Sequence, residues 1–220
     1  MQKLSSLIAL ALLWSGQASA NLITNGDFES PAGSSYQLTS ANPPSSWSYS
    51  GTGADYYSAN GGWGISAQGG SYYIGLGHNG STGGRLTQDF TATVGNVMHG
   101  EFWLSTQQYQ QSNNPLEQLD VRIINLNNNS VVYQHAFSIF DQVWTKELFD
   151  FVAPSASLRL QMTDITTAQN SGPVNFGLDT VSLEDTGVTG PSNVPEPASL
   201  ALLGVGLFGA RVFGKRRKRS

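Results

Sequence analysis

The stretch QLDVRIINLNNNSVVYQHAFS, residues 118–138, decides the fold class of this chain. Two runs rich in β-forming residues, 118–126 and 130–138, flank three consecutive asparagines. Asparagine tolerates the positive φ angle that a tight hairpin turn requires. The stretch therefore predicts two antiparallel strands joined at Asn127, Asn128 and Asn129.

The first run alternates between apolar and mixed positions, as expected when successive side chains of a strand point to opposite faces. One face holds Leu119, Val121 and Ile123, and the other holds Asp120, Arg122 and Ile124. Residues 157–162 repeat the pattern, with leucine and methionine on one face and polar side chains on the other. Each strand is thus expected to bury one face only.

On both sides of this stretch, over residues 21–185, there are further runs in which apolar and polar residues alternate. These runs are bounded by Gly, Asn, Ser and Pro. The expected strands are 71–77, 86–91, 98–106, 118–126, 130–138, 144–151, 157–162 and 174–183. We therefore expect an all-β domain at 21–187, an antiparallel β-sandwich of jelly-roll type. Residues 31–70 show little alternation, and we expect long loops there.

Composition excludes several classes of protein. The chain has 220 residues and no Cys, so it has no disulfide framework, no thiolate zinc site and no cysteine nucleophile. The formal net charge is −4, but most of the basic residues lie at the two ends. Between residues 21 and 190 there are 4 basic and 14 acidic residues, a balance of −10. This balance argues against nucleic acid as a partner.

The N-terminus has the organisation of a secretory signal peptide over residues 1–20. Lys3 is the charged residue, 4–14 is the apolar core, and Ala18-Ser19-Ala20 is the cleavage site. The apolar core is shorter than the roughly 20 residues that span a membrane as a helix. We expect export, and a mature chain that begins at Asn21.

The C-terminus has three parts in order. A linker at 188–197 contains the motif Val194, Pro195, Glu196 and Pro197. A short hydrophobic, transmembrane or sorting helix is expected at 198–213, and a basic cytoplasmic tail at 214–220. The prolines on either side of Glu196 make the motif extended, and a processing enzyme can bind an extended segment as a strand. Basic charge after the helix holds that end in the cytoplasm, so the domain faces outward.

This tail resembles the PEP-CTERM sorting signal of Gram-negative, biofilm-forming bacteria. The resemblance implies processing by an exosortase, a membrane-embedded cysteine transpeptidase, and delivery to the cell surface or extracellular matrix. Until then the helix would hold the chain in the inner membrane. The alternative is an ordinary C-terminal membrane anchor behind a proline-containing linker.

The two ends of the domain carry a second resemblance. Asn21-Leu22-Ile23-Thr24-Asn25-Gly26-Asp27-Phe28-Glu29 and Phe176-Gly177-Leu178-Asp179-Thr180-Val181-Ser182-Leu183 look like the first and last strands of galactose-binding-like jelly rolls, which include carbohydrate-binding modules. In that family the two strands meet, often at a structural calcium. Leu178 and Val181 are both apolar although they are three residues apart, so the inward–outward alternation is interrupted between them. This interruption suggests a β-bulge near Asp179.

The resemblance implies calcium ligands among Asp27, Glu29 and Asp179, since calcium prefers carboxylate and carbonyl oxygens. Each residue also has a structural interpretation. Asp27 would cap a turn, Glu29 would be solvent-exposed, and Asp179 would pair with Arg159 or accept backbone hydrogen bonds.

Aromatic residues are concentrated in the first third of the domain. Indole and phenol rings stack on sugars, and we expect Trp47, Tyr49, Trp63 and Trp103 to include glycan-contacting residues. The alternative for each ring is a place over the end of the sandwich core. Trp103 is expected on the strand face opposite Phe102.

No nucleophile motif, metalloprotease motif or phosphate-binding loop is present. We therefore expect a non-enzymatic surface or matrix protein whose β-sandwich binds carbohydrate or acts structurally in the extracellular polymer. A secreted glycan-active hydrolase and a simple membrane-anchored adhesin are the alternatives.

Overall fold

The computed structural model describes residues 20–31, 36–51, 54–58, 65–76, 83–106, 117–139, 142–166 and 176–190. The chain divides into two units, residues 1–188 and 189–220, and only Thr189 and Gly190 of the second are described. The expected signal-peptide core, sorting motif, C-terminal helix, basic tail and Trp63 lie outside the described residues.

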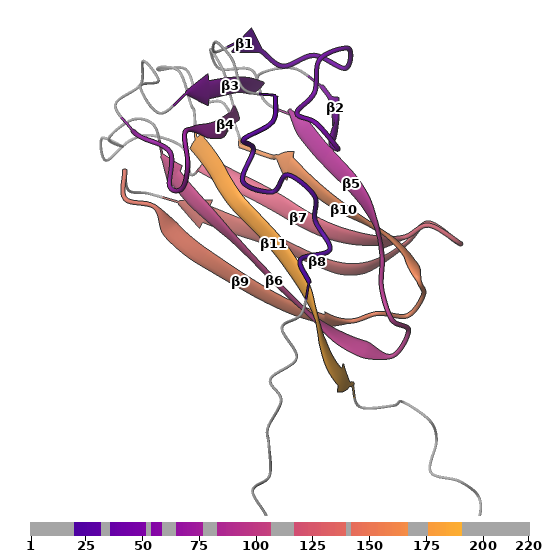
Figure 1. The fold of residues 1–220 in the computed structure, drawn as a ribbon. Helices are drawn as coiled ribbons and strands as arrows, with labels where there is room; N and C mark the ends of the chain where they lie inside the picture. Colours follow the sequence, from indigo (N-terminus) through magenta and orange to yellow (C-terminus); the bar gives the residue numbers. More distant parts are fainter. Residues whose placement is uncertain are drawn as a thin grey trace, which may run out of the picture. The chain divides into compact units, whose positions relative to one another are not determined.

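Every regular element in the described ranges is a β-strand, and the strands form two antiparallel sheets (Figure 1). Sheet A contains, in spatial order, β1 (Tyr36–Gln37), β3 (Ala54–Ser58), β4 (Tyr72–Leu76), β11 (Phe176–Thr189), β6 (Asn96–Thr106) and β9 (Thr145–Val152). Sheet B contains β2 (Ser48–Ser50), β5 (Arg85–Thr91), β10 (Ser157–Asp164), β7 (Glu117–Asn125) and β8 (Ser130–Ile139). The predicted antiparallel β-sandwich is confirmed.

All eight expected strands are present, with ends shifted by a few residues. The expectation of loops throughout residues 31–70 is wrong, because β1, β2 and β3 lie there. These strands are short and sit toward the sheet edges, where pairing with a neighbour defines them. β2 pairs with β5, and β3 pairs with β4. Strand β11 also continues to Thr189, two residues beyond the expected end of the domain.

The predicted hairpin joins β7 and β8. Asn129 adopts φ 57°, the left-handed conformation expected of an asparagine turn. Its N–H donates to the carbonyl oxygen of Asn125 at 2.8 Å. The two strands pair from Glu117 opposite Ile139 to Asn125 opposite Ser130, with one irregularity after Ile123.

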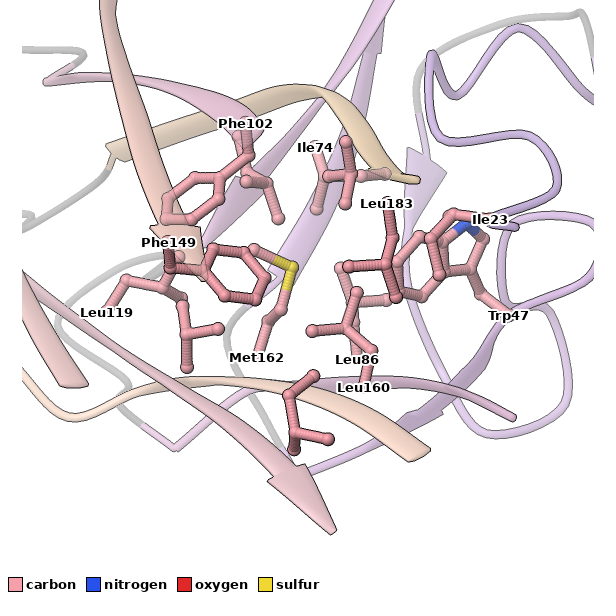
Figure 2. Close-up of a cluster of buried hydrophobic side chains, with 14 of the residues drawn as sticks. Ile23, Trp47, Ile74, Leu86, Phe102, Leu119, Phe149, Leu160, Met162 and Leu183 are labelled. Carbon is pink, nitrogen blue, oxygen red and sulfur yellow. The ribbon is translucent and has the colours of Figure 1, made fainter. Parts of the chain in front are cut away.

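The core lies between the sheets and confirms the predicted alternation (Figure 2). Leu119, Val121 and Ile123 are buried, as are Leu158, Leu160 and Met162. Sheet A contributes other apolar side chains to the same cluster, among them Ile74, Phe102, Phe149 and Leu183. Figure 2 shows Met162 beside Phe149, and Trp47 beside Ile23 at the other side of the cluster.

The first and last segments of the domain meet, as the family resemblance implies. The Leu22 N–H donates to the Leu183 carbonyl oxygen at 2.7 Å, and Asn21 forms a β-bridge with Glu184. The Val181 N–H donates to the Gly26 carbonyl oxygen at 2.8 Å. A Cβ at position 26 would overlap the Val181 carbonyl oxygen, which explains why glycine stands there.

The expected irregularity in the last strand is centred on Thr180. Its φ is 49°, an uncommon value for a β-branched residue. Leu178 and Val181 are both buried, although an unbroken strand would point residues three apart to opposite faces. The left-handed conformation of Thr180 turns the strand so that the Val181 side chain again points into the core. The Asp179 side chain is buried as well.

Candidate functional site

Two carboxylates hold a loop against the domain, and we call Glu29, Asp179 and residues 68–72 the carboxylate hub. Asp179 Oδ2 accepts hydrogen bonds from the backbone N–H groups of Gln68 at 2.9 Å and Gly69 at 3.2 Å. Its Oδ1 accepts from the Thr180 N–H at 2.7 Å. Glu29 Oε1 accepts from the Ser71 and Tyr72 N–H groups at 2.7 Å and 2.9 Å.

Backbone conformation lets the loop approach these carboxylates closely. Gly70 has φ 62°, and a Cβ there would overlap the Glu29 carboxylate. The Thr180 hydroxyl donates to Gln68 Oε1 at 2.7 Å, which adds a side-chain link between β11 and the loop. Asp179 thus accepts backbone hydrogen bonds, one of its two structural interpretations, whereas Arg159 forms its ion pair with Asp89.

The Asp179 carboxyl is a strongly perturbed acid. Burial raises its pKa to about 7; the three N–H donors oppose this shift, and the nearby charge of Glu29 adds to it. A positive charge beside the Asp179 carboxyl would favour its ionised form.

The predicted calcium ligands are only partly brought together. Glu29 and Asp179 share the hub, whereas the Asp27 side chain is exposed. The described residues contain no group of three or more His, Cys, Asp or Glu side chains that could hold a metal ion. A calcium ion at the hub would use the two carboxylates together with backbone carbonyl oxygens, a donor set that suits this ion.

The aromatic candidates have different surroundings. Trp47 and Tyr49 are only 4% exposed and belong to the core. The Trp47 Nε1–H donates to the Asn25 carbonyl oxygen at 3.0 Å, and the Trp47 ring lies 5.5 Å from that of Phe28. Neither Trp47 nor Tyr49 presents a ring face to a ligand, so we do not place them at a binding surface. Their burial matches the alternative interpretation, a place over the core.

Trp103 is half-buried on the outer face of sheet A, on the side of β6 predicted from alternation. The Lys146 Nζ lies 5.3 Å from the centroid of its ring and 2.9 Å from Glu101 Oε2. A sugar stacking on that side of the ring would have to displace the lysine.

Elsewhere on the outer face of sheet A lies a small second cluster that sequence reasoning missed. Tyr73 and Trp144 pack edge to face at 5.7 Å, together with Ile65. The Trp144 Nε1–H donates to the Ser66 carbonyl oxygen at 2.8 Å. A Cβ at Gly177 would lie 2.7 Å from the Trp144 ring, so the glycine makes room for this cluster.

The outer face of sheet B is polar, and sequence reasoning also missed it as a unit. Strand register places Thr87, Gln161, Arg122 and Gln134 in one row across β5, β10, β7 and β8. Asp120 lies in the neighbouring row, two residues before Arg122 on β7, and is almost fully buried. Its carboxylate accepts from Arg122 Nε at 2.5 Å and from Gln134 Nε2 at 2.9 Å. Alternation within each strand predicts which of these side chains point outward. Placing them in one row also requires the register between the strands.

No helix in the described ranges is long and apolar enough to cross a membrane. Residues 193–218 match the PEP-CTERM protein-sorting motif. No curated protein shows significant sequence similarity to the chain.

The body has structural relatives of low sequence identity. TmCBM61, solved in complex with β-1,4-galactotriose, is similar with a TM-score of 0.53 at 14% identity over 76% of this chain and 99% of that one. The arabinose-bound α-L-arabinofuranosidase MgGH51 is similar with a TM-score of 0.50 at 13% identity, over 77% of this chain and 27% of that one. The chain therefore has a β-sandwich with the fold of carbohydrate-binding modules, followed in the sequence by a PEP-CTERM sorting motif.

Proposed function

We propose that this protein is an exported, non-enzymatic surface or matrix component whose β-sandwich binds carbohydrate. The observation that carries the proposal is the pairing of a PEP-CTERM motif with a domain similar to TmCBM61 over 99% of that module. The sorting motif would deliver the protein to the outside of the cell, where a domain of this fold can meet extracellular polysaccharide. A purely structural role in the extracellular polymer is the second candidate.

In this proposal the C-terminal motif is the substrate of an exosortase-type enzyme in a Gram-negative host. The test is the intact mass of the protein recovered from the host surface and medium, beside a variant with Pro195, Glu196 and Pro197 replaced by alanine. We expect a native chain that begins at Asn21 and ends near the motif, and a heavier variant retained in the membrane. A native chain that keeps Ser220 would indicate a simple anchor.

Carbohydrate binding is tested by electrophoresis of the exported protein through gels that contain one polysaccharide each. Retardation by at least one polymer, reversed by its soluble fragments, supports binding. Equal migration in all gels by folded protein would favour the structural role. Incubation with the same polymers separates binding from hydrolysis, because a hydrolase would release new reducing ends and a binding domain would not.

A further inference from the structure

Three of the four basic side chains between residues 21 and 190 lie on one face of the sandwich. Arg85 on β5, Arg159 on β10 and Arg122 on β7 all point outward from sheet B, because the apolar residues next to each of them along its strand are buried in the core. We infer that this arginine face binds a polysaccharide that carries carboxylate groups, such as a uronate polymer. The inference rests on the proposed carbohydrate binding and names the class of ligand.

The charge of the face differs from that of the body. Among the described residues, three arginines stand there with two carboxylates, Asp89 and Asp120, whereas residues 21–190 as a whole have 4 basic and 14 acidic residues. An acidic body repels polyanions in general. A local reversal of sign on one sheet face therefore points to selective contact with negative groups.

The three guanidinium groups differ in how many of their N–H donors already form hydrogen bonds within the protein. Arg159 forms a two-point contact with Asp89, at 2.6 Å and 3.0 Å. Arg122 contacts Asp120 through Nε, and within the described ranges its two terminal nitrogens make no hydrogen bond. Arg85 is exposed, and its side chain makes no ion pair or hydrogen bond with any described residue. Arg85 and Arg122 therefore have donors available for a ligand.

Guanidinium donors match the geometry of a carboxylate, which accepts two parallel hydrogen bonds from one arginine. Register places Arg85 opposite Thr163, and Thr163 opposite Asp120, two residues before Arg122. Strand spacing and rise put the Cα atoms of Arg85 and Arg122 about 12 Å apart. One carboxylate cannot satisfy both, so the face suits a polymer with several acidic units.

Polar neighbours complete the surface. Gln134 is exposed beside Arg122, and Thr87 is half-buried in the same row. Amide and hydroxyl groups of this kind bond sugar hydroxyls. The described part of this face has no aromatic side chain, so we expect recognition by ion pairs and hydrogen bonds rather than by stacking, with strong dependence on salt.

The test measures the affinity of the exported protein, in EGTA, for polygalacturonate and for the same polymer after its carboxyl groups are reduced to alcohols. We expect polygalacturonate to bind at least about tenfold more tightly, and the preference to shrink as salt rises. Arg85→Gln and Arg122→Gln should each weaken that binding about tenfold, the effect of one lost charged hydrogen-bonded contact. Arg122→Lys keeps the charge but removes the planar fork, and should weaken binding as well.

The control is Val94→Glu. Val94 is 60% exposed in the turn between β5 and β6, and this substitution changes the net charge by the same −1 as Arg85→Gln. Unchanged binding in Val94→Glu, with loss in the arginine variants, supports the face. If Val94→Glu weakens polygalacturonate binding as much as the arginine variants do, the loss follows from net charge alone. That result would overturn the inference. Equal or tighter binding of dextran sulfate would overturn the preference for carboxylates.

The outcomes also separate this inference from the proposed function. Binding to the reduced, neutral polymer without preference for polygalacturonate overturns the acidic ligand and leaves carbohydrate binding intact. Arginine variants that bind like wild type overturn the arginine face and relocate the site to another surface. Absence of binding to either polymer, and to the wider set of polysaccharides, by protein with a normal unfolding transition, overturns both. The Arg85 side chain has no described hydrogen-bond or ion-pair partner, so the Arg85→Gln variant should fold normally.

Discussion

The Asp179 carboxylate accepts a hydrogen bond from the Gln68 N–H at 2.9 Å, across a separation of 111 residues. This bond attaches the loop before β4 to the last strand of the domain. Glu29, from the first segment, holds the next part of the same loop. Three distant parts of the chain therefore meet at two acids, and the domain should respond there to protons and cations.

The stability of the metal-free protein should fall as pH rises. The pKa of Asp179 is about 7 in the folded protein against an ordinary 3.8, so the folded state binds the proton more tightly. Its stabilising contribution is complete below the ordinary pKa and is lost as pH rises through about 7. Urea unfolding in EGTA at several pH values measures this slope. Asp179→Asn should flatten it, and an unchanged slope in that variant would contradict the assignment.

Calcium should reverse that loss if the carboxylate hub holds the ion. After dialysis against EGTA, added calcium should raise the unfolding temperature, with about 2.7 kcal/mol gained at a hundredfold excess over Kd. Glu29→Gln and Asp179→Asn should abolish the increase. Asp150→Asn, which removes an exposed carboxylate paired with His99, is the control and should keep it. No calcium effect on the native protein would count against the predicted site.

Gly26 should be among the least replaceable residues of the domain. Alanine there would drive its Cβ into the Val181 carbonyl oxygen, at the contact that joins the first segment to β11. We expect Gly26→Ala to cost about 3 kcal/mol or more, in the range of other strained or overpacked core changes. Gly187 differs from Gly26, because its φ is positive at 68° but a Cβ at that position would meet no atom within 4 Å. Gly187→Ala should cost only about 1 kcal/mol, and equal losses in denaturant unfolding would refute the steric explanation.

The two described tryptophans that were glycan candidates should separate stability from binding. Trp47→Ala removes a buried ring and should cost about 3–5 kcal/mol. Trp103→Ala should cost under about 1 kcal/mol, since it removes a half-buried ring and one exposed cation–π contact. If Trp103 contacts glycan, its variant should lose affinity while keeping its unfolding temperature. Full affinity in Trp103→Ala would remove this ring from the binding surface.

Much of the fold is predictable because the long strands each bury one face. Leu119, Val121 and Ile123 show this directly, and the asparagine turn after them sets the pairing of β7 with β8. Strands β1 to β3 were not predictable in the same way. Ser48–Ser50 offers one apolar side chain, Tyr49, and its strand character depends on pairing with β5.

The candidate sites depended on contacts between residues far apart in sequence. The motifs at the two ends of the domain correctly placed Glu29 near Asp179, but nothing in them identified Gln68 or Gly69 as the donors. Trp47 and Trp103 are both tryptophans in a β-rich sequence, and only packing separates a core ring from a half-buried one. Likewise, the placement of Arg85 and Arg122 near each other on one face depends on the register through β10.

Carbohydrate binding by the β-sandwich can be measured by calorimetric titration with polysaccharide purified from the host's own extracellular matrix. We expect saturable heat of binding to the exported protein, and we expect this heat to be lost when the polymer is depolymerised to single sugars. The absence of binding heat with every polysaccharide fraction of the matrix, for protein that shows a cooperative unfolding transition, would contradict it.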